Sequence, residues 1–261
     1  MLAAERKNRI LEKLQEEKKV IVSQLSEQFQ VSEETIRRDL EKLEKEGLCT
    51  KSYGGALLRE NGGVDLPFAI RQKANMEGKR IIAGLIADML EEGDHVFLDA
   101  STTALSILEQ IRDKEITVIT NSVEVLMAAS EDNRWSVMST GGNLVERYMA
   151  LVGPMAMCGI EAVNADKVIL SCKGIDMEKG ITDANELFAQ VKQTMLKHAG
   201  KAILAVDCTK FKRIGFSNIC GIEDIDLVVT DKKPTQEWLS CFNEKGVKCI
   251  YGEQESRKEM R

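Results

Sequence analysis

From residue 76 onward, short apolar runs alternate with amphipathic helical stretches, and this alternation limits the fold more than any other feature of the sequence. Continuous apolar strands separated by helices, such as 184–200 and 235–246, predict a mostly parallel sheet covered by helices, the α/β class. A helix over 76–91 is expected to open this region. The strand candidates are HVFLD (95–99), ITVIT (116–120), WSVMS (135–139), KVILS (167–171), KAILAV (201–206), DLVVT (226–230) and VKCIY (247–251).

Small polar residues or glycines follow five of these strand candidates. Ligands of parallel α/β sheets bind beyond the carboxyl ends of the strands, so these segments predict one shared pocket. Helix starts rich in hydroxyl groups suit a phosphate, lysines suit its charge, and carboxylates suit sugar hydroxyls, which together favour a sugar phosphate. At each single segment, ordinary helix capping by Ser or Thr is the alternative. The candidate ligand residues are Asp99, Ser101, Thr102, Thr103, Asn121, Gly141, Gly142, Lys173, Asp176 and Lys210.

The first 58 residues have a different pattern, with three short helices expected before an alternating segment. Ser23 and Ser32 are the expected N-caps of the second and third helices, and Gly47 is expected to end the third. A short turn separates these two helices, as in a helix-turn-helix. The expected buried positions are Ile10, Leu11, Leu14, Leu25, Phe29, Ile36, Leu40 and Leu43.

The third helix is the expected recognition helix. Opposite its buried stripe it presents Thr35, Arg37, Arg38 and Lys42, which we expect near the N-terminal end, where such helices meet base edges and phosphates. Arginine is well suited to a bidentate guanine contact or a phosphate clamp. The alternative is a small helical bundle whose charges are simply solvated.

The segment LCTKSYGGALL (48–58) alternates around a Gly-Gly pair and predicts a two-stranded wing. Lys51, Ser52 and Tyr53 lie near the expected tip, where they could reach the DNA backbone. Helix, turn, helix and wing within one short unit favour DNA binding over a plain bundle.

The stretch ERKNRILEKL…VSQLSEQFQVSEETIRRDLEKLEKEG…YGGA resembles the winged helix-turn-helix of the DeoR family of bacterial transcription regulators over residues 3–58. The resemblance implies that Ser32, Thr35, Arg37 and Arg38 occupy DNA-contacting positions. The family often has histidine where this chain has Tyr53.

The blocks LDASTTAL, TNS, TGGN, KGID…GIT and DCTKF resemble, in order, those of the DeoR-type sensor domain over residues 76–252. That domain is related in fold to ribose-5-phosphate isomerase and binds phosphorylated sugars or related metabolites. The resemblance therefore implies that the candidate ligand residues surround such an effector. The family usually has glycine where Ser101 stands, and small residues are common at the positions of Cys172 and Lys173.

Composition narrows the class of protein further. The net charge is −6, but residues 1–58 carry eleven Lys and Arg against eleven Asp and Glu, so the acidity belongs to the later region. None of the seven cysteines has the two-residue spacing of a zinc clip or redox pair, and His95 and His198 lie far apart in sequence, so we expect no metal and no cofactor. The apolar runs are too short to span a membrane, and the N-terminus lacks the apolar core of a signal peptide, which predicts a cytoplasmic protein.

The leading hypothesis is a DNA-binding transcriptional regulator, a repressor of a sugar-catabolism operon that a sugar phosphate relieves. It would not be an enzyme, and it would bind a double-stranded operator as a homodimer or homotetramer. One alternative is a sugar-phosphate isomerase with an added headpiece, using Asp99, Asp176 or Asp207 as base. Another is a thiol-based redox sensor. The expected domains are a headpiece (1–58), a linker and docking arm (59–75) whose Phe68 and Ile70 pack on the next domain, and a sensor (76–261).

Overall fold

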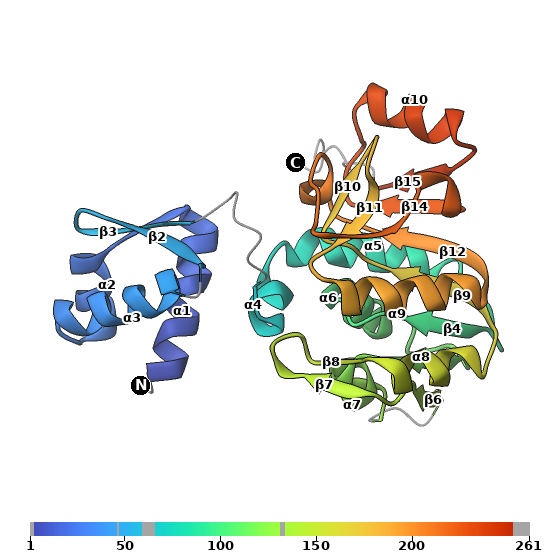
Figure 1. Ribbon diagram of the computed structural model, residues 1–261, viewed down its shortest axis with the longest axis horizontal. Coiled ribbons are helices and arrows are strands. Elements are labelled where there is room, and N and C mark those ends of the chain that lie inside the picture. The colour runs from blue at the N-terminus through green and yellow to red at the C-terminus, as the bar shows by residue number, and fades with distance from the viewer. Residues whose placement is uncertain (1–2, 46, 59–65, 131–133, 253–261) are drawn as a thin grey trace, which may run out of the picture. The chain divides into compact units, whose positions relative to one another are not determined.

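The computed structural model describes residues 3–45, 47–58, 66–130 and 134–252 (Figure 1). It divides into two compact units, Met1–Ala74 and Asn75–Arg261. Part of the expected linker, 59–65, and the end of the expected sensor, 253–261, lie outside the described residues.

The first unit contains the predicted helix-turn-helix. The side chains predicted to be buried in its three helices are all at most 8% exposed, and those of the third helix, Ile36, Leu40 and Leu43, at most 1%. One apolar cluster therefore holds the three helices together. The elements are α1 (Ala3–Glu17), β1 (Lys19–Ile21), α2 (Val22–Phe29), α3 (Glu33–Lys45), β2 (Cys49–Ser52), β3 (Gly55–Leu58) and α4 (Phe68–Lys73).

The predicted wing is present, but it belongs to a three-stranded sheet in the order β1-β3-β2. The first strand, β1, was not predicted, and it lies antiparallel to β3 with Ile21 opposite Gly55. A Cβ atom on Gly55 would stand 2.0 Å from the carbonyl oxygen of Val20, so only glycine allows this close strand contact.

Two predictions for this unit are wrong. Ser23 does not cap α2, because the helix begins at Val22, directly after Ile21 of β1, and lacks a side-chain cap. Ile70 does not pack on the following domain, because α4 belongs to the first unit and Ile70 lies in the apolar cluster of α1–α3. The arm is also fastened by an ion pair between Lys73 and Glu12 of α1, at 2.6 Å.

The second unit is built on a seven-stranded sheet in the order β15-β14-β12-β9-β4-β5-β6. Every strand pair in it is parallel. The seven apolar runs of the sequence all form strands of this sheet, which confirms the predicted α/β class. The strands are β4 (His95–Leu98), β5 (Thr117–Thr120), β6 (Ser136–Ser139), β9 (Ala165–Leu170), β12 (Ala199–Ala205), β14 (Leu227–Thr230) and β15 (Lys248–Tyr251).

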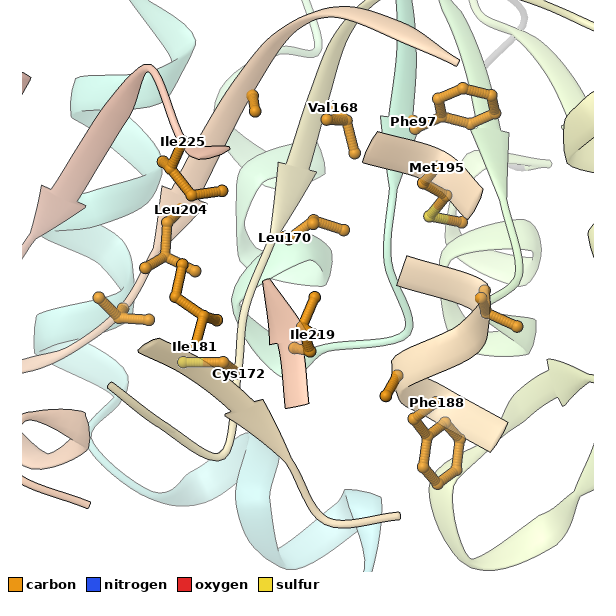
Figure 2. Close-up of a cluster of buried hydrophobic side chains, with 14 of the residues drawn as sticks. Phe97, Val168, Leu170, Cys172, Ile181, Phe188, Met195, Leu204, Ile219 and Ile225 are labelled. Carbon is orange, nitrogen blue, oxygen red and sulfur yellow. The ribbon is translucent and has the colours of Figure 1, made fainter. Parts of the chain in front are cut away.

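Helices cover the sheet, as Figure 1 shows for α9, which runs across one face. The largest apolar cluster joins that face to α8, α9 and α10 and is drawn in part in Figure 2, where Phe188 and Met195 of α9 accompany Leu170 and Leu204 of the strands. The helices of this unit are α5 (Met76–Ala87), α6 (Thr102–Gln110), α7 (Val123–Ala129), α8 (Pro154–Glu161), α9 (Glu186–Lys197) and α10 (Gln236–Glu244).

Two small antiparallel sheets were not predicted. The hairpin of β7 (Asn143–Val145) and β8 (Ala150–Val152) is one, and β10 (Gly174–Asp176), β11 (Gly180–Asp183) and β13 (Ser217–Cys220) form the other. These strands have only three or four residues, and all except β8 contain glycine or polar residues, so they lack the longer apolar runs of the main sheet.

Candidate DNA interface and strand-end site

The recognition helix α3 starts as the sequence predicts. The backbone N–H of Thr35 donates to Oγ of Ser32 at 3.3 Å, and the hydroxyls of these two residues lie 2.9 Å apart. Both predicted DNA-contacting residues therefore help to shape the helix start, in addition to any contact they make with DNA.

The two recognition-helix arginines are held by acids of the same helix. Arg37 pairs with Glu33 at 2.7 Å and Arg38 pairs with Glu34 at 3.3 Å, each one turn apart. All four side chains are about half exposed or more, which makes these pairs weak and easily exchanged for phosphate contacts. The arginines thus remain available on the outer side of α3.

The remaining DNA-binding candidates lie apart from this helix start. Lys42 is exposed in the last turn of α3, so its predicted place near the N-terminal end is wrong. Lys51 in β2 reaches Glu41 of α3 at 3.0 Å. Tyr53 is fully exposed at the turn between β2 and β3, at the tip of the predicted wing.

A buried ion pair between α1 and α3 was missed. Arg6 donates to Asp39 at 2.6 Å, and both side chains are less than 10% exposed. The signal was available in the sequence, because Asp39 directly precedes the buried Leu40 and lies three positions after the buried Ile36 and four before the buried Leu43. The pair fixes α1 against the inner side of the recognition helix.

In the second unit, Asp99 joins the ends of two neighbouring strands. It follows β4 and is 1% exposed. Its carboxylate accepts hydrogen bonds from the backbone N–H of Ser101, at 3.1 Å, and from that of Ser171, which follows β9, at 2.8 Å. Asp99 therefore shapes the carboxyl edge of the sheet at its centre.

Lys192 of α9 lies between Asp99 and Asp183 and was not predicted. Its ammonium group is 2.5 Å from the carboxylate of Asp183 and 3.1 Å from that of Asp99, and it donates to the carbonyl of Ser171 at 2.7 Å. Burial lowers the pKa of Lys192, but the two carboxylates outweigh it, so the pKa stands above its usual value. The overlooked signal is a lysine beside Val191 on the buried face of an amphipathic helix.

Cys172 belongs to the apolar core drawn in Figure 2 and lies close to the charged groups of Lys192, Asp183 and Asp99. Burial raises the pKa of its thiol to about 12, with Lys192 and Lys210 opposing the shift and Asp183 and Asp99 adding to it. The structure thus brings the predicted residues Asp99 and Lys210 to one region. We call Asp99, Cys172, Asp183 and Lys192 the strand-end cluster.

Asn121 directly follows β5, the strand beside β4, and is 2% exposed. Its side-chain N–H donates to the carbonyl of Leu151 at 2.9 Å, which fixes the orientation of the amide. Its Oδ1 is buried and has no hydrogen-bond partner among the described residues. An acceptor in this position favours a ligand that brings a hydroxyl or N–H donor.

Several other candidates have clear structural roles. Ser101 caps α6, since its Oγ accepts from the N–H of Ala104 at 3.0 Å, and Thr102 and Thr103 are buried in the first turn. After β6, Gly141 and Gly142 both have positive φ, and a Cβ on Gly142 would stand 2.7 Å from the Val152 carbonyl oxygen. Capping and close packing therefore contribute to these blocks, as the alternative reading expected.

Lys173 directly precedes β10 of the second small sheet, and Asp176 is the last residue of that strand. The backbone of Lys173 donates to the carbonyl of Thr182, one residue before Asp183 of the strand-end cluster. The carboxylate of Asp176 instead accepts from the N–H groups of Glu178 and Lys179, both at 3.0 Å, and so closes the hairpin turn. Asp176 is thereby engaged in the turn of this hairpin.

The contacts of Asp99 and the burial of most cysteines argue against the two alternative hypotheses, an isomerase and a thiol-based redox sensor. Asp99 already accepts two backbone hydrogen bonds and an ion pair, unlike a base poised for proton abstraction. The pKa of Cys49, Cys172, Cys208, Cys220, Cys241 and Cys249 is raised by burial, so these thiols are protonated at neutral pH. Among the described residues, no cluster of three His, Cys, Asp or Glu side chains could hold a metal ion, and no helix is long and apolar enough to cross a membrane.

Comparison with known proteins identifies both units. The family described as "DeoR-like helix-turn-helix domain" matches residues 6–61, and "DeoR C terminal sensor domain" matches residues 74–232. The HTH-type transcriptional regulator YulB of Bacillus subtilis is 38% identical, over 95% of this chain and 96% of its own. The transcriptional repressor AccR of Agrobacterium fabrum is 34% identical, over 87% and 89%. The L-fucose operon activator of Escherichia coli is 32% identical, over 89% and 96%.

Solved structures show a more distant likeness. Ribose 5-phosphate isomerase A from Methanocaldococcus jannaschii has 12% identity and a TM-score of 0.40, over 53% of this chain and 55% of that one.

Proposed function

The chain belongs to the DeoR family of transcriptional regulators, which bind DNA through the helix-turn-helix and a small-molecule effector through the sensor domain, and we propose that it is a repressor of a sugar-catabolism operon that a phosphorylated sugar releases from DNA. The repressor AccR and the L-fucose operon activator are both relatives, so the sign of regulation is part of the proposal.

The observation that carries the proposed effector class is the set of groups at the carboxyl edge of β9, β4 and β5. Asn121 offers a buried acceptor, Oδ1, that no described residue satisfies. The strand-end cluster, with Lys210 electrostatically close to it, supplies fixed carboxylates and cations. A sugar hydroxyl suits the Asn121 oxygen, and a phosphate suits a lysine.

We propose that Ser32, Thr35, Arg37 and Arg38 contact the operator at the start of α3, with Lys51 and Tyr53 on the wing and Lys42 farther along the helix. One such unit makes few phosphate contacts, which favours a homodimer or homotetramer. Its two headpieces would read half-sites separated by about 34 Å, one turn of DNA.

A thermal-shift screen tests the effector class. The full chain is mixed with pentose, hexose and deoxy-sugar phosphates, each beside its unphosphorylated sugar. We expect one phosphate to raise the melting temperature and its parent sugar to have no effect at the same concentration. If no sugar phosphate stabilises the protein, the proposed effector class is wrong, although the family assignment stands.

Operator release is then measured with DNA fragments selected by the protein from a random pool. The stabilising sugar phosphate should weaken binding to these fragments. Lys173→Ala should weaken that response by about tenfold or more, the effect of losing a hydrogen bond to a charged group, and should leave binding without the sugar unchanged. Lys179→Ala, an exposed lysine of the neighbouring hairpin turn, is the matched control.

A further inference from the structure

One buried carboxylate joins two segments of the second unit that are far apart in sequence. Asp231 follows β14 and is 3% exposed. Its Oδ1 accepts the backbone N–H of Cys208 at 2.6 Å, and its Oδ2 accepts a side-chain N–H of Asn75 at 3.3 Å. Both oxygens belong to one planar group, so a rotation that follows one partner changes the distance to the other.

The Cys208 side of this contact is the loop after β12, residues 207–211. Asp207 accepts the N–H of Thr209 at 2.9 Å, and the N–H of Lys210 donates to the Asp207 carbonyl at 3.0 Å. The loop also forms a bridge from Phe211 to Ile175 of β10. It therefore carries the candidate effector residue Lys210, while its backbone is fixed to Asp231.

The Asn75 side is the first residue of the second unit, directly after Ala74, the last residue of the first. Asn75 has φ 47° and ψ 47°, a left-handed conformation that asparagine tolerates better than most residues. Its carbonyl accepts the N–H of Lys79 in the first turn of α5 at 3.1 Å. Asn75 thus sets the direction in which the chain enters α5.

The packing around this contact leaves no spare room. A Cβ atom on Gly78 would stand 2.4 Å from the side-chain nitrogen of Asn75 and 2.7 Å from Oδ2 of Asp231. Since real side chains do not approach so closely, glycine at this place in α5 is required for Asn75 and Asp231 to meet. A substitution at Gly78 therefore disturbs the contact without altering either partner.

We propose that Asp231 is a positioning residue that couples the loop 207–211 to the conformation of Asn75, where the sensor begins. The coupling gives the proposed effector site a physical route to the junction with the DNA-binding unit, and this consequence rests on the proposed function. The coupling itself requires neither DNA nor a sugar, so it is tested without them.

The test is amide hydrogen exchange of the full chain, followed by mass spectrometry. Asn75→Asp keeps the size of the side chain and tolerates the left-handed backbone, but it replaces the donor with a carboxylate facing Asp231. Loss of one hydrogen bond increases opening by about two- to tenfold, and we expect exchange in 207–211 to accelerate by this factor. Gly78→Ala adds a methyl group on α5 that displaces Asn75 and Asp231 from each other, so it should also accelerate exchange in 207–211.

Asp226→Asn is the matched control, because Asp226 accepts the N–H of Ala202 at 2.7 Å at the other end of the same strand pair. It should leave exchange in 207–211 unchanged. In the reverse direction, Asp207→Ala loosens the loop and should accelerate exchange in 75–79, since coupling between two sites is reciprocal.

If Asn75→Asp and Gly78→Ala accelerate exchange only in 75–79, the contact is a local anchor and the proposal is wrong. The same conclusion follows if Asp226→Asn accelerates exchange in 207–211 as much as they do. Failure of the sugar-phosphate screen would overturn the proposed effector and leave this result untouched.

Discussion

Arg37 donates a hydrogen bond to the carboxylate of Glu33, one turn earlier on α3, over 2.7 Å. The same spacing joins Arg38 to Glu34 at 3.3 Å. In the free protein, acids of the recognition helix therefore neutralise the cations proposed to bind DNA. Such exposed pairs contribute only about 0.3–0.5 kcal/mol each, less than a good contact between arginine and DNA.

Glu33→Gln should strengthen DNA binding. The change releases Arg37 and removes a negative charge that faces the phosphates, so we expect about two- to fivefold tighter binding to both operator and unrelated DNA. Fluorescence anisotropy with labelled duplexes at several salt concentrations measures the effect. Glu5→Gln, which breaks the equivalent pair with Arg9 on α1, is the control. Equal effects of the two substitutions would contradict a special role of Glu33.

Arg38→Ala should reduce the preference for operator over unrelated DNA. Loss of one bidentate base contact costs about 1–3 kcal/mol, which weakens operator binding by about five- to 150-fold. Arg9→Ala removes an exposed arginine with a similar partner and should have little effect. Competition between operator and random DNA measures the preference. Unchanged operator affinity in Arg38→Ala would remove Arg38 from the interface.

Most of the fold follows from the sequence because its signals are local. Seven apolar runs form the seven parallel strands, and helices with apolar stripes form the headpiece. The short strands β7, β8, β10, β11 and β13 were missed because pairing with neighbours, rather than an apolar pattern, defines them. The position of Ile70 was wrong because an apolar residue in a linker does not reveal which unit it packs against.

The candidate site was only partly predictable for a related reason. Asp99 and Asn121 could be placed because they follow strands of one sheet, whose carboxyl ends meet at the same edge. Lys192 comes from helix α9, and only the folded chain shows that it contacts Asp99, more than ninety positions away. The sequence nevertheless indicates that Lys192 has a role, since a charge on the buried face of a helix requires a partner.

Lys192→Met should destabilise the second unit strongly. It leaves Asp99 and Asp183 buried and close together without their cation, and breaking a buried ion pair in this way costs about 3–5 kcal/mol. Urea denaturation followed by tryptophan fluorescence measures the loss. The double variant Lys192→Met, Asp183→Asn removes one uncompensated charge and should recover part of it. No recovery would mean that packing, rather than charge, is what Lys192 supplies.

The stability difference between the wild type and Lys192→Met depends on pH with a defined sign. The pKa of Lys192 is raised in the folded protein, so its stabilising contribution is fully present below the ordinary value of 10.5 and is lost only as the pH rises through the folded pKa. The stability difference between the wild type and Lys192→Met should accordingly be constant from about pH 7 to pH 9, well below the ordinary lysine pKa. A difference that shrinks within this range would show that Lys192 loses its proton earlier.

Cys172 should resist alkylation in the native protein. Burial raises the pKa of its thiol to about 12, so almost none of it is thiolate at neutral pH. Cys158 is exposed and serves as the internal reference. Iodoacetamide at neutral pH, followed by peptide mass spectrometry, should label Cys158 first and Cys172 only after unfolding. Equal labelling, together with loss of DNA binding on oxidation, would restore the redox-sensor hypothesis.

Gly141→Ala and Gly142→Ala separate backbone conformation from packing in the TGGN block. Both positions have positive φ, but a Cβ on Gly141 meets nothing within 4 Å, whereas one on Gly142 would stand 2.7 Å from the Val152 carbonyl oxygen and 2.9 Å from Cβ of Ala156. Gly141→Ala should therefore cost about 1–2 kcal/mol from its left-handed backbone alone. Gly142→Ala should cost at least about 1 kcal/mol more, because overpacking adds to the strain.

The urea midpoints of Gly141→Ala and Gly142→Ala measure which substitution destabilises the protein more. If an effector approaches the backbone here, Gly141→Ala should also reduce the thermal shift given by the stabilising sugar phosphate, since the new methyl group occupies the open side. A normal thermal shift in this variant, with the expected modest loss of stability, would assign Gly141 to the turn alone and place the effector nearer Asp99.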